Sequence, residues 1–151
     1  MLVWRICRHA YRELDGEGAR VNGGRWNSEG VAVIYTSASL SLAALELLVH
    51  VEPLSIPADL VAMEIQIPDT RGISAYAEVK QLPHDWRAYP APDWEADLGD
   101  TWIHDGAFLV LGVPSAVVPE EFNVLINPAH PAMRQVKVIS VRPFRFDDRL
   151  L

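Results

Sequence analysis

The alternation of apolar and polar positions along the chain predicts several short strands. Residues 2–6 and 31–36 are β-branched or aromatic runs bounded by turn residues, as is typical of buried strands. The segment LVAMEIQIP, which begins at Leu60, alternates apolar and polar side chains and predicts a half-buried strand. Three further strands are expected at residues 108–113, 116–118 and 136–141.

A helix is predicted from Ser39 to His50. Its sequence from residue 40 onward, LSLAALELLVH, carries apolar side chains on every side of a helical wheel, so we expect a helix that is buried nearly all round. Ser37 or Ser39 is the expected N-cap, and Pro53 follows the expected end of the helix.

The remaining pattern sets the fold class. A second, amphipathic helix is expected at residues 94–105, and the proline-interrupted stretch 73–92 is expected to be mostly loop. Strands and helices do not alternate strictly, which favours an α+β fold over an α/β fold. The length of 151 residues suits a single compact domain spanning residues 1–151, and 50% hydrophobic residues supply its core.

Charged residues are unevenly distributed along the chain. The formal net charge of −7 argues against direct, sequence-independent binding to nucleic acid. Residues 1–25 carry a net charge of +2 and residues 134–151 carry +3, whereas residues 26–133 carry −12. If the two termini pair in one sheet, we expect their arginines to form a local site for a small anion. Solvated surface charge is the alternative for any single arginine.

Several other classes of protein are disfavoured. Cys7 is the single cysteine, so no internal disulfide forms and the cytoplasm is the expected location. No signal peptide is evident, and no apolar run approaches the roughly 18 residues of a membrane span. The five histidines lack metal-ligand spacing, and the sequence has no P-loop, no paired C-x-x-C and no complete dinucleotide fingerprint. We therefore expect no metal and no Rossmann-type cofactor site.

Glu46 is the one charge within the predicted apolar helix. Burial of an unpaired carboxylate costs on the order of several kcal/mol, so Glu46 requires a cation, strong donors, a water-lined cleft or a bound proton. A buried carboxylate in a cleft is a candidate for function. A structural ion pair, or a gap in the packing that admits solvent, is the alternative.

The segment GGRWNSEGVAVIYTS, residues 23–37, combines glycine, arginine and aromatic residues. Its two glycines let the backbone approach a ligand, and the Arg25 guanidinium suits a phosphate or carboxylate. Trp26 is a candidate for stacking. Tyr35 ends the strand that leads into the helix of Glu46, so both residues are able to face one cleft. The alternatives are an Arg25–Glu46 ion pair and ordinary core packing of the two aromatic residues.

A third cluster, VPSAVVPEEFNVLINPAHP, covers residues 113–131. It places Ser115, Asn123, Asn127 and His130 among prolines and short strands. Asn127 is a candidate for binding a ligand. Asn-Pro and His-Pro favour turns. The alternative is therefore that Asn127 and His130 only shape the backbone. No G-x-S-x-G motif surrounds Ser115, and a hydrolase triad is not supported.

Together the three clusters resemble the RES domain family over nearly the whole chain. The resemblance rests on WRI, LDGEGAR, GGRWNSEG, YTS, LELLVH and PSAVVPEEFNVLINPAHP, which begin at residues 4, 14, 23, 35, 45 and 114. It implies that the arginine, glutamate and serine of the family name are Arg25, Glu46 and Ser115, with Tyr35 also in the site. It further implies a mixed sheet like that of ADP-ribosyltransferases. It also implies a function, because members of the family are toxins of bacterial toxin–antitoxin pairs that consume NAD+.

The chemistry of these residues fits cleavage of the nicotinamide–ribose bond, with NAD+ as substrate and no further cofactor. Nicotinamide leaves as a neutral molecule, so no general acid is needed, and Glu46 alone would stabilise the oxocarbenium-like sugar. Arg25 would hold the diphosphate, with Tyr35 and Trp26 available to stack. Ser115 would position the nicotinamide end.

The acceptor and the partner stay open at the level of sequence. Net NAD+ breakdown by water or phosphate is favoured, because no exposed motif for recognising a protein substrate is evident. Mono-ADP-ribosyl transfer to a cellular protein is one alternative, and a non-catalytic NAD-binding or interaction module is another. The resemblance also implies an antitoxin with an Xre-type helix-turn-helix region, which would contact DNA on behalf of the complex.

Overall fold

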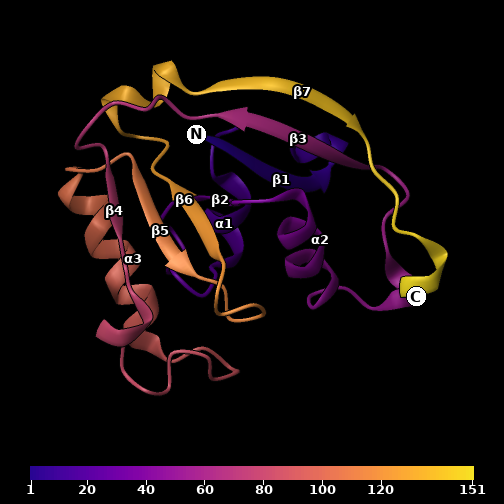
Figure 1. The fold of residues 1–151 in the computed structure, drawn as a ribbon, viewed down its shortest axis with the longest axis horizontal. Helices are drawn as coiled ribbons and strands as arrows, with labels where there is room; N and C mark the ends of the chain where they lie inside the picture. Colours follow the sequence, from indigo (N-terminus) through magenta and orange to yellow (C-terminus); the bar gives the residue numbers. More distant parts are fainter.

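The computed structural model describes residues 1–151 and contains one seven-stranded mixed sheet with three α-helices (Figure 1). This arrangement confirms the α+β prediction. The strands are β1 (Leu2–Arg8), β2 (Ile34–Ser37), β3 (Leu60–Gln66), β4 (Ser74–Tyr76), β5 (Val110–Pro114), β6 (Phe122–Ile126) and β7 (Lys137–Pro143). The helices are α1 (Glu17–Asn22), α2 (Leu40–Leu48) and α3 (Asp93–Asp105).

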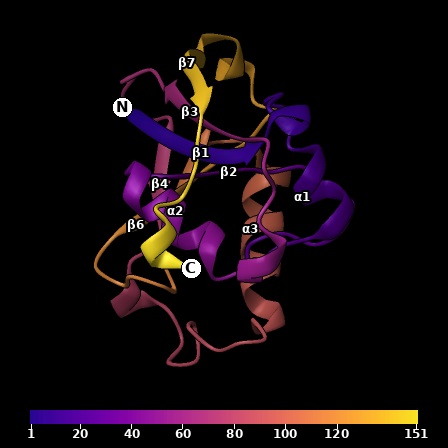
Figure 2. The ribbon, with the colours of Figure 1, turned by 90° about the vertical axis from the view of Figure 1, so that its right-hand side faces the viewer.

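The strand order is β4-β5-β6-β2-β1-β3-β7. Only β4 and β5 run parallel to each other, and the other neighbouring pairs are antiparallel. Figure 1 shows α3 beside β4 and β5 and α2 below β1, at the other end of the sheet. Figure 2 looks from the end that carries α2 and the C-terminus, and again places β7 at the upper edge.

Two hydrophobic clusters form the core on opposite faces of the sheet. Successive side chains of a strand point to opposite faces, and on β5 the neighbours Val110 and Leu111 accordingly belong to different clusters. The first cluster includes Val3 of β1. The second contains Trp26 and Trp102, and through Trp102 it packs α3 against the sheet. Strand β5 is buried throughout because it is covered on both faces.

Most of the predicted elements are present. Strands β1, β2, β3, β5 and β7 and helices α2 and α3 overlap the segments expected from the sequence. The strand predicted at 116–118 is wrong, because the Ser115 hydroxyl oxygen accepts hydrogen bonds from the Val117 and Val118 backbone N–H groups and holds a turn there. Three elements were not predicted: α1, β6 and the three-residue β4, which lies within the expected loop 73–92.

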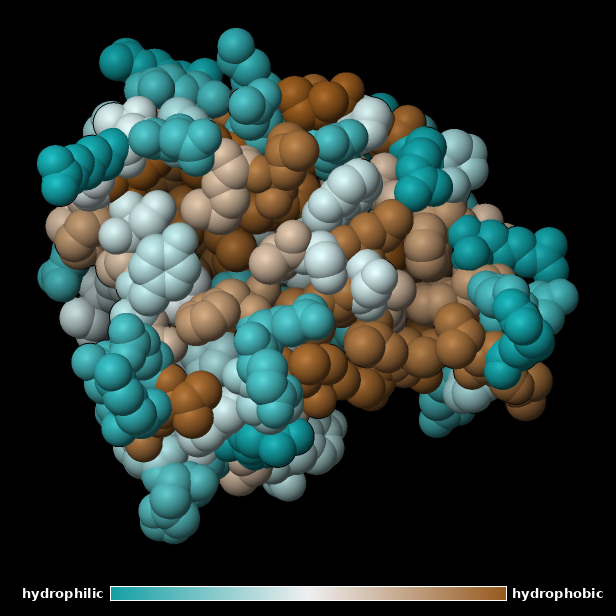
Figure 3. All heavy atoms as spheres, viewed as in Figure 1, coloured by the Kyte–Doolittle hydropathy of each residue, from teal (hydrophilic) through white to brown (hydrophobic).

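Helix α2 differs from the expectation of burial on all sides. Only Leu42 and Ala43 are buried, whereas Leu45 is 41% exposed and Glu46 is half-buried. The sheet covers one face of α2, and no other layer covers the rest. Figure 3 shows apolar side chains at the surface over this helix. Ser39 is the N-cap, since its hydroxyl accepts a hydrogen bond from the Leu42 backbone N–H at 3.1 Å.

The basic termini do not pair with each other. Strand β3 lies between β1 and β7, and no basic residue of the segment 134–151 lines the large cavity described below. The expectation of an anion site shared by both termini is therefore wrong in its C-terminal half. None of the helices has the length and apolar character needed to cross a membrane.

Candidate active site

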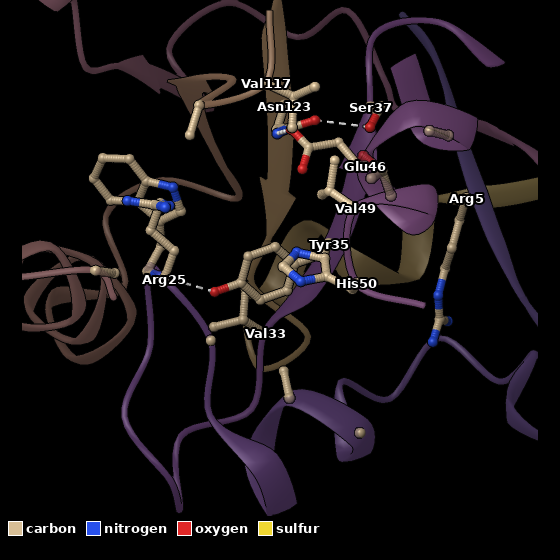
Figure 4. Close-up of a pocket in the computed structure, with 18 of the residues that line it drawn as sticks. Arg5, Arg25, Val33, Tyr35, Ser37, Glu46, Val49, His50, Val117 and Asn123 are labelled. Atoms are coloured by element: carbon tan, nitrogen blue, oxygen red, sulfur yellow. Dashed lines mark hydrogen bonds between the residues drawn. The ribbon is translucent and has the colours of Figure 1, made fainter. Parts of the chain in front are cut away.

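A cavity of about 810 Å³ opens between β1, β2, α2 and the loops that follow α1 and β5. A cavity of this size is typical of a site for a small-molecule ligand or cofactor. It brings together Arg25, Tyr35 and Glu46, which the sequence places in two separate clusters. Figure 4 shows Tyr35 and Glu46 near the middle of the site, with Arg25 and Arg5 on opposite sides.

The Glu46 carboxylate is held by one of its two oxygens. The Ser115 hydroxyl donates to Oε1 at 2.7 Å, and the Asn123 side-chain amide donates to the same oxygen at 2.5 Å. Asn123 is itself oriented by the Ser37 hydroxyl, which donates to its Oδ1 at 2.7 Å. No protein donor contacts Oε2, so this oxygen is available to a ligand in the cavity (Figure 4).

The structure brings Ser115 to Glu46 but not to the cavity surface. Ser115 is fully buried, and its hydroxyl joins the carboxylate to the Val117 and Val118 N–H groups of the following turn. All the hydrogen-bonding groups of this hydroxyl are engaged within the protein. Ser115 therefore acts through Glu46, and the role of holding the nicotinamide end, expected from the sequence, has no support in this geometry.

Tyr35 is fixed by the loop that carries Arg25. Its hydroxyl donates to Asn27 Oδ1 at 2.7 Å and accepts from the Trp26 backbone N–H at 3.0 Å. Burial raises the pKa of Tyr35, so the phenol stays protonated. A Cβ on Gly24 would lie 2.8 Å from the Tyr35 hydroxyl, which explains why a glycine precedes Arg25. Tyr35 lines the cavity.

Arg25 is anchored through one end of its guanidinium. Nη1 donates to the carbonyl oxygens of Trp86 and Ala88 and to Glu95 Oε2, each at 3.1 Å. The Nε and Nη2 groups have no protein acceptor, and the side chain lines the cavity. The alternative of an Arg25–Glu46 ion pair is therefore wrong, because the carboxylate that pairs with Arg25 is Glu95.

The two remaining candidates belong to the framework of the site. Trp26 is among the residues that line the cavity, but it is 2% exposed and packs edge-to-face against Trp94 with the ring centroids 6.4 Å apart, so its ring belongs mainly to the core. Asn127 is 1% exposed and does not line the cavity; its Oδ1 accepts from the Ala129 N–H. Asn127 and His130, which caps the next turn, both shape the backbone. We therefore leave Asn127 out of the site.

Basic side chains dominate the charge around the cavity. Arg5, Arg87 and His50 line it in addition to Arg25, and Glu46 is the only acid among the lining residues. Arg5 and Arg87 donate to backbone carbonyls at 3.1 Å and have no carboxylate partner. This lining favours an anionic ligand in spite of the negative net charge of the chain. No three histidine, cysteine or acidic side chains cluster in a way that would hold a metal ion.

Sequence reasoning named Asn123 in the third cluster without giving it a role, and it missed Glu95. Asn123 lies opposite Ser37 in the β2–β6 register, and the unpredicted strand β6 is what carries it to Glu46. Glu95 lies in the first turn of α3, where an acidic residue is ordinary, and nothing in the local pattern distinguishes it. Its burial depends on contacts with residues 70 positions away along the chain.

A family model described as the RES domain matches residues 2–147. The chain belongs to the RES domain family. Among its relatives, this RES domain is 40% identical to "Prs ADP-ribosylating toxin" of Sphingobium sp. (strain YBL2), covering 98% of this chain and 95% of that protein. It is 39% identical to "Toxin Res" of Yersinia enterocolitica, covering 99% of both chains.

A solved structure supports the fold of the RES domain. The Mycobacterium tuberculosis MbcT–MbcA toxin–antitoxin complex contains a chain that superposes with a TM-score of 0.73 at 17% identity. The match covers 95% of this chain and 83% of that chain. At this level of identity the comparison establishes a shared fold.

Proposed function

We propose that this RES domain cleaves the nicotinamide–ribose bond of NAD+ and acts as the toxin of a toxin–antitoxin pair. The observation that carries the proposal is the presentation of Glu46 in the cavity. Ser115 and Asn123 hold Oε1, while Oε2 has no protein donor, and Arg25 lines the same cavity. A fixed carboxylate and an anion-binding guanidinium in one cavity match the two charges of the substrate.

The carboxylate would stabilise the positive charge that develops on the sugar. Nicotinamide is cationic while it is attached to ribose and leaves as a neutral molecule, with the bonding electron pair moving to its ring nitrogen. The ribose carbon becomes oxocarbenium-like, and no proton needs to be delivered to the leaving group. Oε2 of Glu46 would accept a hydrogen bond from a ribose hydroxyl and lie close to the developing charge. Such preorganised charge is worth several kcal/mol of barrier, on the order of that of an oxyanion-hole donor.

Arg25 and Tyr35 would bind the rest of the dinucleotide. The free Nε and Nη2 groups of Arg25 form the planar pair of donors that suits a phosphate. The protonated Tyr35 ring offers a flat apolar surface beside Glu46. The additional positive charge of Arg5 and Arg87 would raise the local concentration of the anionic substrate.

Two fates of the ADP-ribosyl group deserve a direct test. Capture by water or phosphate gives net NAD+ breakdown, which we favour because no long exposed motif for recognising a protein substrate is evident in the sequence. Transfer to a protein is the second candidate, and the name of the Sphingobium relative, an ADP-ribosylating toxin, supports it. Both share the bond cleavage described above.

An antitoxin partner is part of this proposal. The MbcT–MbcA structure is that of a toxin with its antitoxin, and a shared fold makes a partner of this kind reasonable for the present chain. We expect the partner to carry an Xre-type helix-turn-helix and to provide the DNA contacts, since the toxin is acidic. Operator binding by the isolated toxin at moderate salt would contradict this division of roles.

The test is to incubate the purified protein with NAD+, with and without phosphate, and to identify the products by mass. Release of nicotinamide together with ADP-ribose indicates hydrolysis, and a phosphorylated ADP-ribose indicates phosphorolysis. Labelling of a cellular protein with little free product indicates the transferase. Binding of NAD+ without any nicotinamide release, in the absence and in the presence of a cell extract, would contradict the proposal and favour a non-catalytic module.

A further inference from the structure

Glu95 is the most deeply buried acidic side chain of the molecule, and it lies behind the wall of the cavity. Its exposure is 0%, and only Oε2 has a partner, the Nη1 group of Arg25 at 3.1 Å. Oε1 has no hydrogen-bond partner. A carboxylate with one unsatisfied oxygen is costly to bury, so its retention at this position requires an explanation.

The other contacts of Arg25 indicate what the buried Glu95 carboxylate does. Nη1 also donates to the carbonyl oxygens of Trp86 and Ala88, which lie in the loop that brings Arg87 to the cavity. Three acceptors therefore converge on one nitrogen of the guanidinium. Two of them are neutral carbonyl oxygens, and the third is the full negative charge of Glu95. With Nη1 fixed in this way, the planar geometry of the group determines where Nε and Nη2 lie.

We infer that Glu95 is a positioning residue that aims the free donors of Arg25 at the phosphates of the dinucleotide. The inference rests on the proposed function, in which Arg25 binds the diphosphate. Glu95 does not line the cavity and does not touch the ligand. It acts by holding one end of an arginine whose other end binds the anion.

If Glu95 had a purely structural role, its loss would affect folding more than ligand binding. Replacing both members of a buried ion pair by apolar side chains is often neutral or stabilising, whereas removing one member is strongly destabilising where the other charge stays buried and unpaired. Arg25 is 20% exposed in its side chain, so without Glu95 the guanidinium is able to turn toward water in the cavity. Loss of Glu95 should therefore disorder the donors of Arg25 and weaken ligand binding more than it affects folding.

The experiment measures the affinity for ADP-ribose by calorimetry, because this probe contains the diphosphate and is not cleaved. The variants are Glu95→Gln, which keeps the shape, Glu95→Leu, which removes all polar atoms, Arg25→Ala, and the double variant Arg25→Ala/Glu95→Gln. The matched control is Asp97→Asn, since Asp97 is exposed on the same helix and takes part in no ion pair. Thermal unfolding of each variant is followed in parallel.

We expect Glu95→Gln and Glu95→Leu to weaken ADP-ribose binding about tenfold, as is typical for loss of one charge-assisted hydrogen bond. In the Arg25→Ala background the Glu95 substitution should have no further effect on binding, because there is no guanidinium left to position. Glu95→Leu should bind weakly while unfolding at or above the wild-type temperature. In turnover, the KM for NAD+ should rise while kcat stays within about threefold of wild type.

The outcomes separate this inference from the proposed function. If Arg25→Ala weakens binding but both Glu95 variants bind like wild type, Glu95 has no positioning role and the function of Arg25 stands. If the Glu95 substitution weakens binding equally in the presence and absence of Arg25, it acts through the general packing and the inference is overturned. If wild-type protein and Arg25→Ala bind ADP-ribose equally, or neither binds it, the diphosphate role of Arg25 in the proposed function fails as well.

Discussion

Glu46 on α2 lines the cavity and Glu95 on α3 lies behind its wall, and the two carboxylates have opposite kinds of partner. Glu46 is half-buried and receives two hydrogen bonds from neutral groups on one oxygen. Glu95 is fully buried, pairs with the positive charge of Arg25 and leaves one oxygen without a partner. Neutral donors orient Glu46 without cancelling its charge. At Glu95, in contrast, the positive charge of Arg25 neutralises the carboxylate within the protein.

The difference teaches which carboxylate is able to act on a ligand. A charge that is held by hydroxyl and amide groups still has its field available to a cation that forms nearby. A charge that is neutralised by an arginine has little field to offer, but it fixes the position of that arginine. Burial alone, which first suggested a function for Glu46, would have selected the wrong glutamate.

The largest contrast is expected in the rate of nicotinamide release. Glu46→Gln keeps the shape of the side chain and removes its charge, so kcat should fall by about 100-fold or more with little change in KM. Glu95→Gln should produce the reverse, a higher KM with kcat nearly unchanged. Steady-state assays of nicotinamide release by wild type and both variants, purified in the same way, make the comparison. Equal effects on kcat would remove the distinction between the two glutamates.

The next effect concerns the packing of α3, the helix that carries Glu95. A Cβ on Gly99 of α3 would lie 1.7 Å from the Trp26 carbonyl oxygen, and a backbone atom is unable to move aside cheaply. Gly99→Ala should therefore lower the free energy of unfolding by about 3 kcal/mol or more. Gly18→Ala is the matched control, because a Cβ there meets nothing within 4 Å. Denaturation in urea measures both, and a mild effect at Gly99 would show that α3 is less tightly seated behind Arg25 than the structure indicates.

A smaller effect is expected from the donors that hold Glu46. Asn123→Ala removes one of the two hydrogen bonds to Oε1 and leaves the Ser115 hydrogen bond and its turn intact. We expect cleavage to slow about tenfold without a large loss of stability. Ser115→Ala should in addition destabilise the fold, because the Val117 and Val118 N–H groups lose their acceptor. Measuring rate and unfolding free energy together separates the two roles, and an unchanged rate in Asn123→Ala would mean that Ser115 alone orients the carboxylate.

The sequence predicted the fold where the local pattern and the tertiary environment agree. The alternation in β3 and the apolar run of α2 both form the elements that they indicate. Strand β6 was missed because the turn chemistry of residues 115–118, in which the Ser115 side chain replaces a backbone partner, displaces the strand toward Phe122. Strand β4 has only three residues and exists because β5 offers a free edge.

The residues of the site could be predicted from the sequence, but the contacts between them could not. The resemblance to a family named Arg25, Tyr35, Glu46 and Ser115, and the structure places the first three around one cavity and the fourth behind Glu46. The burial of Glu46 was overestimated, because an all-apolar wheel does not reveal that no layer covers the outer face of α2. The pairing of Arg25 with Glu95 joins residues 70 positions apart, and no local pattern encodes it.

The smallest expected effect concerns the pH dependence of stability at Glu95. Burial raises the pKa of this carboxyl above its usual value of about 4.5, with the positive charge of Arg25 opposing the shift. Because the folded state holds the proton more tightly than the unfolded state, the contribution of Glu95 to stability is complete below pH 4.5 and is lost as the pH rises through the raised pKa. In Glu95→Gln this loss cannot occur.

The unfolding free energy of Glu95→Gln should therefore increase relative to that of wild type as the pH rises above about 4.5, and the difference should level off once Glu95 is ionised in the folded protein. Urea denaturation of both proteins in steps between about pH 4 and pH 8 measures it. If wild type instead gains stability over the variant as the pH rises, Arg25 more than compensates the burial of Glu95. The two glutamates would then differ in their accessibility to the ligand but not in the cost of their charge.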